Sequence, residues 1–146
     1  MTILPCRDPA QLARLVPLAS AEGFRFLDRL VTEWTEGTNR FDQPGETLLI
    51  VEINGKTVAC GGITRQGETL GRIRRVYVDP HFRHLGFGRG LVGTLIAQAE
   101  ASFTTLVLFT DNPDATRLYE HFGFIPEDPT STPDHATHRL NLRAGD

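Results

Sequence analysis

The chain has 146 residues, of which 40% are hydrophobic and 23% charged, and this ordinary composition excludes a disordered or fibrous protein. That length fits one domain and is short for two, so we expect residues 1–146 to form a single domain. The net charge of −3 argues against a general binder of nucleic acid or of anionic membranes.

The N-terminus and the cysteines indicate where the protein works. Cys6 and Cys60 match no metal-binding or redox spacing, and unpaired thiols are typical of cytosolic proteins. The first residues lack the charged start and apolar stretch of a signal peptide. No apolar run approaches the ~18 residues that a membrane span needs. We therefore expect a soluble, cytoplasmic protein.

The first 46 residues predict a short strand and two helices. Residues 2–7 are compatible with a strand, and Asp8 followed by Pro9 predicts the start of a helix that runs to about Ala19. Ser20 predicts the cap of a second helix, which Gly37 ends and a polar loop follows. Apolar residues recur along this second helix at helical spacing, and they are Phe24, Leu27, Leu30, Val31 and Trp34.

Strands dominate the middle of the chain. Residues 47–53 and 56–63 are rich in β-forming residues, and Asn54-Gly55 between them is a strong two-residue hairpin turn. Residues 66–68 allow a second hairpin into a strand over residues 70–78. Asp79-Pro80 ends that strand.

The last third predicts alternating helices and strands. A helix runs from about Gly88 to Ala101, followed by a strand over 105–110. Asn112-Pro113 caps a helix that ends near Gly123. A short strand at residues 124–125 and a last strand near 137–142 follow it. The order β-α-α-β-β-β-α-β-α-β-β combines antiparallel hairpins with a β-α-β crossover. It predicts an α/β fold with a mixed (α+β) sheet covered by helices.

Basic residues and glycines gather in one segment. Between residues 65 and 89 there are six arginines (65, 72, 74, 75, 83 and 89) against two acidic residues (68 and 79), a local charge of +4. The same segment ends in a glycine-rich turn over residues 83–90, and glycines let several backbone N–H groups point at one spot. A helix starts there, and its N-terminus favours an anion. The pattern predicts a phosphate or pyrophosphate site, with a solvated strand and an ordinary turn as the alternative.

Residues 88–93 also match the dinucleotide pattern G-x-G-x-x-G, with Asp111 about 20 residues further on. In that motif the first glycine follows directly on a strand, but here residues 79–85 intervene. The antiparallel hairpins upstream do not build a doubly wound sheet either. We therefore disfavour a nicotinamide dinucleotide site.

Three blocks in this region together carry a family resemblance. Arg83-x-x-Gly86-x-Gly88 has the form [Q/R]-x-x-G-x-[G/A], residues 74–80 read RRVYVDP, and residues 112–124 match N-x-x-A-x-x-L-Y-x-x-x-G-F. In this order they resemble the pyrophosphate loop, the fourth strand and the cofactor-closing block of the GNAT acetyltransferase superfamily. The resemblance spans about residues 70–126. It implies the GNAT-like acyl-CoA N-acyltransferase fold and acetyl transfer from acetyl-CoA to a primary amine of a small molecule, without a metal.

The same resemblance assigns a cofactor site. It implies that the backbones of Val76 and Val78 contact pantetheine and that the loop N–H groups hold pyrophosphate. Asn112 has a structural role as a helix cap, to which the resemblance adds a contact with the cofactor arm. The residues implied at the pyrophosphate are Arg83, His84, Leu85, Gly86, Phe87, Gly88, Arg89 and Gly90.

The strand over 70–78 has an unusual pattern. Simple alternation places Arg72, Arg74, Val76 and Val78 on one face, and the other face then holds Ile73, Arg75 and Tyr77. Neither face is cleanly apolar, so we expect a bulge or a splayed edge near Arg75 or Val76.

The resemblance implies that Tyr119 protonates the departing CoA thiolate, a role that suits a phenol of pKa ~10. The alternative is a helix tyrosine that packs with Phe122. Family members often use a glutamate early on the fourth strand as the base, and here Arg72 takes that position. The base therefore stays open among Glu33, Glu68, Asp111, His81 and His121.

The acceptor amine is described only by class. Arg72, Arg74 or Arg40 near its cleft would favour an amine that also carries a carboxylate or a phosphate. Phe41, beside Arg40 in a polar loop, either lines this cleft or anchors the loop. Trp34 is expected in the core, and the spacing of His135 and His138 puts them on opposite faces of a strand, which disfavours a metal site.

Two other function classes remain open at this point. One is a CoA-binding sensor or partner domain of the same fold without turnover, and the missing glutamate keeps it open. The other is a nucleic-acid binder that uses the arginine patch, which the overall acidity disfavours. The resemblance leaves room for a homodimer.

Overall fold

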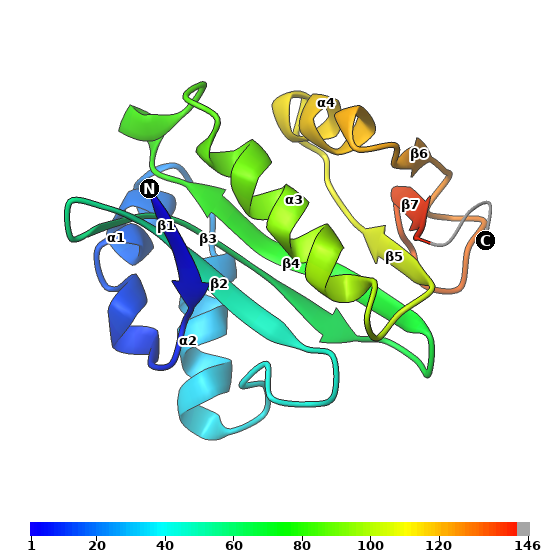
Figure 1. Ribbon diagram of the computed structural model, residues 1–146, viewed down its shortest axis with the longest axis horizontal. Helices are drawn as coiled ribbons and strands as arrows, with labels where there is room; N and C mark the ends of the chain where they lie inside the picture. The colour runs from blue at the N-terminus through cyan, green and yellow to red at the C-terminus, as the bar shows by residue number, and fades with distance from the viewer. Residues whose placement is uncertain (143–146) are drawn as a thin grey trace.

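A seven-stranded mixed sheet forms the centre of the protein, and helices cover both of its faces (Figure 1). This computed structural model describes residues 1–142. The spatial strand order is β1-β2-β3-β4-β5-β7-β6. The strands are β1 (Thr2–Pro5), β2 (Thr47–Ile53), β3 (Lys56–Arg65), β4 (Leu70–Val78), β5 (Thr105–Leu108), β6 (Ile125–Pro126) and β7 (His138–Asn141).

The helices divide between the two faces and enclose two hydrophobic cores. α3 and α4 pack on one face over a core that includes Leu91, Leu95 and Leu106. α1 and α2 pack on the other face over a core that includes Leu27 and Ile50. The helices are α1 (Leu15–Ala21), α2 (Phe26–Glu36), α3 (Phe87–Ala99) and α4 (Pro113–His121), with short 3₁₀ turns η1 (Pro9–Leu12) and η2 (Pro80–Phe82).

The predicted topology is confirmed. Within the described residues β4 and β5 are the one parallel pair, joined by the crossover through α3, and the other strand pairs are antiparallel. β4 and β5 pair only from Leu70↔Thr105 to Arg72↔Val107. Beyond that point β4 runs on to Val78 while β5 ends at Leu108, and Figure 1 shows the strands parting. The sheet therefore opens between its fourth and fifth strands.

The predicted irregularity in β4 is a bulge at Arg75. The register between β3 and β4 shifts between Cys60 and Gly62, and Arg75 has a φ of 63°. A bulge inserts one residue and so reverses the alternation beyond it. Val76 and Val78 consequently pack against the α3 core together with Ile73. The expectation that they share a face with the arginines at 72 and 74 is therefore wrong, because unbroken alternation does not survive the bulge.

The first helix is shorter than predicted. Asp8 caps η1 as expected, with its side chain accepting from the N–H of Ala10, but the helical segment breaks before Leu15. Pro17 explains the break, because it lacks an N–H and its ring excludes the carbonyl four residues earlier from a helix. Starting α1 at Leu15 places Pro17 in the first turn, where both defects are tolerated.

The second helix begins later than predicted. Ser20 lies inside α1, where its hydroxyl donates to Asp28, and it does not cap α2. Gly23 has a φ of 87° and separates the helices. Leu27 and Leu30 are buried as expected, and Gly37 ends α2 with a φ of 82°, in the left-handed region that favours glycine.

The other predicted elements are confirmed to within a few residues at their ends. In α3 the buried residues are Leu91, Val92, Leu95 and Ala99, and Ile96 is partly buried against the same core. Over residues 1–142, none of the helices is both long enough and apolar enough to cross a membrane.

Candidate active site

The opening between β4 and β5 is the starting point of the site. Val76 and Val78 lie on β4 beyond the last pair with β5, and their side chains are partly buried on the α3 side. A strand that loses its neighbour leaves backbone N–H and C=O groups free for an extended ligand. The Val78 carbonyl accepts a hydrogen bond from Arg83 Nε at 3.1 Å, so its predicted contact with a cofactor is left to its N–H.

The turn after β4 presents backbone donors to one spot. Gly86 caps α3 with a φ of 90°, and His84 has a φ of 63°. Among residues 1–142, no acceptor pairs with the N–H groups of His84, Leu85 or Gly86. The first N–H groups of α3 also have no partner within the helix, and they form its positive end. This loop has the donors that an anion such as pyrophosphate needs.

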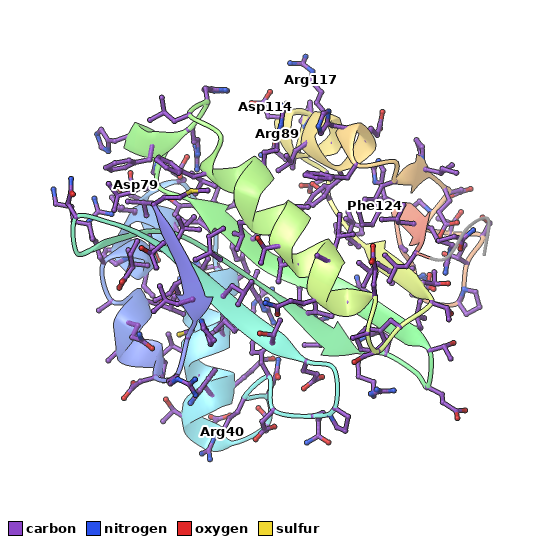
Figure 2. The ribbon with its side chains drawn as sticks, in the orientation of Figure 1. Arg40, Asp79, Arg89, Asp114, Arg117 and Phe124 are labelled. Atoms are coloured by element: carbon purple, nitrogen blue, oxygen red, sulfur yellow. The ribbon has the colours of Figure 1, made fainter. Side chains whose placement is uncertain are left out.

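A groove runs from this loop between α3 and α4. Its volume is about 710 Å³, and its wall includes Gly86, Arg89, Gly90, Gly93, His121 and Phe122. Arg89 stands at the N-terminal end of α3, and Figure 2 shows Asp114 and Arg117 of α4 at the same end of the molecule. Of the predicted residues, Gly86, Arg89 and Gly90 border this groove. Contact of any of them with a cofactor stays a prediction.

Asp79 anchors the entry to the loop. Its side chain is fully buried, where it accepts from the His81 N–H at 2.9 Å and lies 2.6 Å from Arg14 Nη1. Burial by itself would raise the pKa of Asp79, but the hydrogen bond from His81 and the Arg14 guanidinium together hold it below its ordinary value. Sequence reasoning assigned no role to Arg14, because its contact with Asp79 depends on how η1 packs against the sheet.

Arg83 does not point its side chain into the groove. Its Nη1 and Nη2 atoms bond the two carboxylate oxygens of Glu22 at 2.8 and 2.7 Å, and its guanidinium lies over the Tyr77 ring. Tyr77 also donates to Glu22 at 2.5 Å. Only the Arg83 backbone is left for the predicted pyrophosphate contact. Glu22 and Tyr77 were missed, because no local pattern signals partners 55 and 61 residues apart.

Glu22 is suited to an ionic rather than a proton-transfer role. The hydrogen bond from Arg83 lowers the pKa of its carboxyl group, which makes the carboxylate a weak base. This three-residue cluster ties the end of α1 to β4 and to the start of the glycine-rich turn.

Tyr119 projects from α4 into the core beneath the groove. It is 5% exposed, it packs edge-on against Phe124, and burial raises its pKa. Nothing among the described residues accepts a hydrogen bond from its hydroxyl, so the phenol proton is free to be donated to a ligand. Asn112 caps α4 as expected, accepting from the Asp114 N–H at 2.9 Å.

Two residues predicted at the acceptor cleft have structural roles. The Arg40 Nε donates to the Trp34 carbonyl at 2.8 Å at the end of α2, and Figure 2 places Arg40 at the opposite end of the view from Arg89. Phe41 is buried and lies over Gly62, 2.6 Å from where a β-carbon there would be. It anchors the loop, so the second of its two predicted alternatives is the one observed.

The arginines of β4 lie on the α2 face of the sheet. Arg72 Nη1 donates to the Asp134 carbonyl at 3.2 Å, and Arg75 Nη2 lies 3.1 Å from Glu33 Oε1 on α2. Arg74 is partly buried between them. Of the five candidate bases, Glu33 is the one in contact with the bulge. The others lie on the β3–β4 hairpin, after β5, on η2 and at the end of α4, namely Glu68, Asp111, His81 and His121.

Comparison with known proteins gives consistent results. The model of the acetyltransferase (GNAT) family matches residues 13–124. The Escherichia coli K12 protein named uncharacterized N-acetyltransferase YjgM is 29% identical over 137 residues, which cover 85% of this chain and 80% of that protein. A crystal structure from Exiguobacterium sp. 255-15, assigned as an acetyltransferase, superimposes with a TM-score of 0.81 at 28% identity over 96% of this chain and 92% of that chain.

A third relative was solved with a ligand. A Bacillus anthracis Ames protein, assigned as a streptothricin acetyltransferase and in complex with acetyl coenzyme A, matches 59% of this chain and 51% of its own with a TM-score of 0.54 at 22% identity. The family match covers most of the chain and includes the opened sheet, the glycine-rich turn and α4. The chain therefore belongs to the GNAT acetyltransferase family and is an acyltransferase enzyme.

Proposed function

We propose that the protein transfers the acetyl group of acetyl-CoA to a primary amine of a small molecule by direct attack. The observation that carries this proposal is the presence together of three features: the opening beyond Arg72↔Val107, the unpaired N–H groups of residues 84–86, and the groove between α3 and α4. An extended pantetheine arm fits the first, a pyrophosphate the second and the rest of the cofactor the third.

The chain supplies two groups to this reaction, a proton donor and a proton acceptor. The thioester of bound acetyl-CoA supplies the activated acyl group. The amine nitrogen attacks the thioester carbonyl carbon, a C–N bond forms and the C–S bond breaks. Tyr119 gives its phenol proton to the leaving sulfur. A phenol is protonated at neutral pH, and burial raises the pKa of Tyr119 further. The ammonium must lose one proton before attack, and Glu33 is our first candidate for its acceptor. The nitrogen loses a second proton as the amide forms, and that proton restores the phenol of Tyr119 by way of solvent.

We also propose a cytoplasmic location. Cys6 and Cys60 are both free and buried, and neither forms a disulfide. Unpaired cysteines are compatible with a reducing compartment.

Calorimetric titration with acetyl-CoA, CoA and NAD tests the proposal, together with acetyl transfer to a panel of amines. We expect acetyl-CoA and CoA to bind and NAD to produce no heat. Gly86→Ala and Gly55→Ala form a matched pair, since both glycines have a φ near 80–90° and open space around the missing β-carbon. Both variants should lose similar stability, but only Gly86→Ala should weaken acetyl-CoA binding, by roughly tenfold. Binding of NAD alone, or equal affinity in the two variants, would contradict the proposal.

A further inference from the structure

Three arginines form a basic patch where the sheet opens. Arg72, Arg74 and Arg75, here named the β4 arginine cluster, lie on the face of β4 that looks toward α2. The register places Arg74 opposite Gly62, over which the Phe41 ring lies, and Arg75 meets Glu33 of α2. One helix, α2, and the loop that follows it therefore bring residues of the first third of the chain to a cluster from its middle.

Arg74 is the member of the cluster without a partner. Its guanidinium makes no hydrogen bond or ion pair with any residue between 1 and 142, although its side chain is partly buried. Burial, and after it the charges of Arg75 and Arg72, lower its pKa. A partly buried cation beside two like charges is unfavourable unless an anion joins it.

The acidic groups around Arg74 are already occupied. The two that act on it are Glu33 and Glu46. Arg75 holds Glu33 at 3.1 Å, and Glu46 accepts from the backbone N–H of Arg65 at 2.7 Å and of Gln43 at 3.1 Å. The patch therefore keeps a surplus of positive charge.

Other polar atoms of the patch are also unsatisfied. Arg75 Nε and the hydroxyl of Thr64 are buried and lack a partner among the residues described. Thr64 pairs with Arg72 across the β3–β4 ladder, so both atoms belong to the same neighbourhood. Buried polar groups in proteins nearly always have partners, so each exception calls for an explanation such as a bound water or ion or a catalytic role. The hydrogen-bonding capacity of this patch is thus not used up by the fold.

The position of the cluster relates it to the proposed reaction. Arg72↔Val107 is the last pair before β4 and β5 part, and Arg74 and Arg75 follow directly. The groove for the cofactor lies on the opposite face, with α3 and α4. An arm that passes through the opening from that face would bring its thioester toward the cluster. This inference about the path of the arm rests on the proposed acetyl transfer.

We propose that the β4 arginine cluster binds an oxyanion, a carboxylate or a phosphate, carried by the acceptor amine. Arg74 is its main donor, and Arg75 and the remaining nitrogens of Arg72 support it. A guanidinium presents a planar fork of donors that matches either group. The acceptors are then amines that also bear a negative group, while polycationic amines are repelled by the surplus of positive charge.

Matched acceptors test this proposal. Twenty amino acids would be compared with their carboxamides, and O-phosphoethanolamine with ethanolamine, by measuring CoA release. We expect the anionic member of at least one pair to be the better acceptor, and the pair concerned identifies the anion. Arg74→Gln should raise the KM for that acceptor by roughly ten- to a hundredfold and leave kcat and the neutral partner unchanged. The KM of Arg74→Lys should lie between those of wild type and Arg74→Gln, because lysine keeps the charge but loses the planar fork of donors.

Controls separate this role from a structural one. Arg7→Gln removes an exposed arginine outside the cluster and should change no KM. Without ligand, Arg74→Gln should raise the Tm, because it relieves repulsion within the cluster, whereas loss of a structural arginine would lower it. A lowered Tm together with an unchanged KM would overturn the proposal.

The outcomes for the two proposals are distinguishable. If acetyl-CoA binds and carboxamides react as well as amino acids, the oxyanion site is wrong and acetyl transfer stands. If acetyl-CoA does not bind, acetyl transfer fails, and the oxyanion site is then judged by NMR of the Arg74 Nε–H during titration with phosphate and acetate. A shift absent from Arg74→Gln supports the site, and an unmoved signal overturns it.

Discussion

Arg83 and Glu22 form a bidentate ion pair, with both guanidinium nitrogens bonded to the two carboxylate oxygens at 2.8 and 2.7 Å. The pair joins the end of α1 to the first residue of the glycine-rich turn, and Tyr77 supports it from β4. One motif residue of the turn is thus held by a carboxylate from the first quarter of the chain. The side chain positions the loop from outside the groove.

Glu22→Gln should lower the free energy of unfolding by about 1 kcal/mol at neutral pH, a small value because both side chains are about a third exposed. The Arg83 hydrogen bond depresses the pKa of Glu22 below 4.5 in the folded state. Its contribution is therefore complete above that pH and is lost as pH falls through the folded pKa. Urea unfolding at neutral pH and near pH ~3 should show the difference from wild type shrinking in acid. A constant difference would contradict the ionic role.

Asp79→Asn should reduce both stability and cofactor affinity. The change removes the charge that faces Arg14 while keeping an oxygen for the His81 N–H. Arg14 is partly exposed and can regain water, so we expect a loss of about 2 kcal/mol rather than the full cost of a stranded buried charge. Chemical unfolding and acetyl-CoA titration measure the two effects. If the variant is less stable but binds acetyl-CoA as tightly as wild type, Asp79 does not position the loop for the cofactor.

Tyr119→Phe should lower kcat by roughly a hundredfold and leave the Kd for acetyl-CoA unchanged, because only the phenol proton is lost. Tyr77→Phe is the matched control. It deletes the hydroxyl bonded to Glu22 and should cost stability with little effect on kcat. Steady-state kinetics on both variants measures kcat, and calorimetry measures the Kd for acetyl-CoA. Equal kcat in Tyr119→Phe and wild type would leave Tyr119 with a packing role alone.

Gly62→Ala should destabilise the fold by about 1–3 kcal/mol. A β-carbon at this position would lie 2.6 Å from the Phe41 ring and 2.7 Å from the Thr47 carbonyl oxygen, and the backbone atom cannot move away cheaply. Gly67→Ala is the control, since its new methyl would meet only Leu70 at 3.7 Å. Thermal unfolding should lower the Tm of the first variant and leave the second near wild type.

Local patterns predicted the strands of the hairpins well. Residues 47–53 and 70–78 form strands with those bounds, because the Asn54-Gly55 turn and the Asp79-Pro80 break are encoded within a few residues. The bulge at Arg75 was also predictable, because a strand with three arginines and no apolar face has to depart from simple alternation. Which side chains changed faces beyond it was not predicted.

The sequence did not predict features that depend on contacts between residues far apart in the chain. The sequence placed a helix cap at Ser20, but the packing of α1 and α2 against β3 and β4 moved the boundary to Gly23 and Phe26. It left Phe41 open between the cleft and a loop anchor, and the space over Gly62 is what takes the ring into the core. These outcomes depend on residues brought together by the sheet.

By itself the sequence determined the fold class, the order of elements, the glycine-rich turn and the family, because these rest on periodicity, turn chemistry and short motifs. Only the tertiary structure decided how the arginines are used. In the folded protein Arg83 pairs with Glu22, Arg75 pairs with Glu33, and Arg72 donates to the Asp134 carbonyl. Arg74 has no such partner among the residues described. Identical side chains differ here in their partners, because each partner comes from a segment that only folding brings near β4.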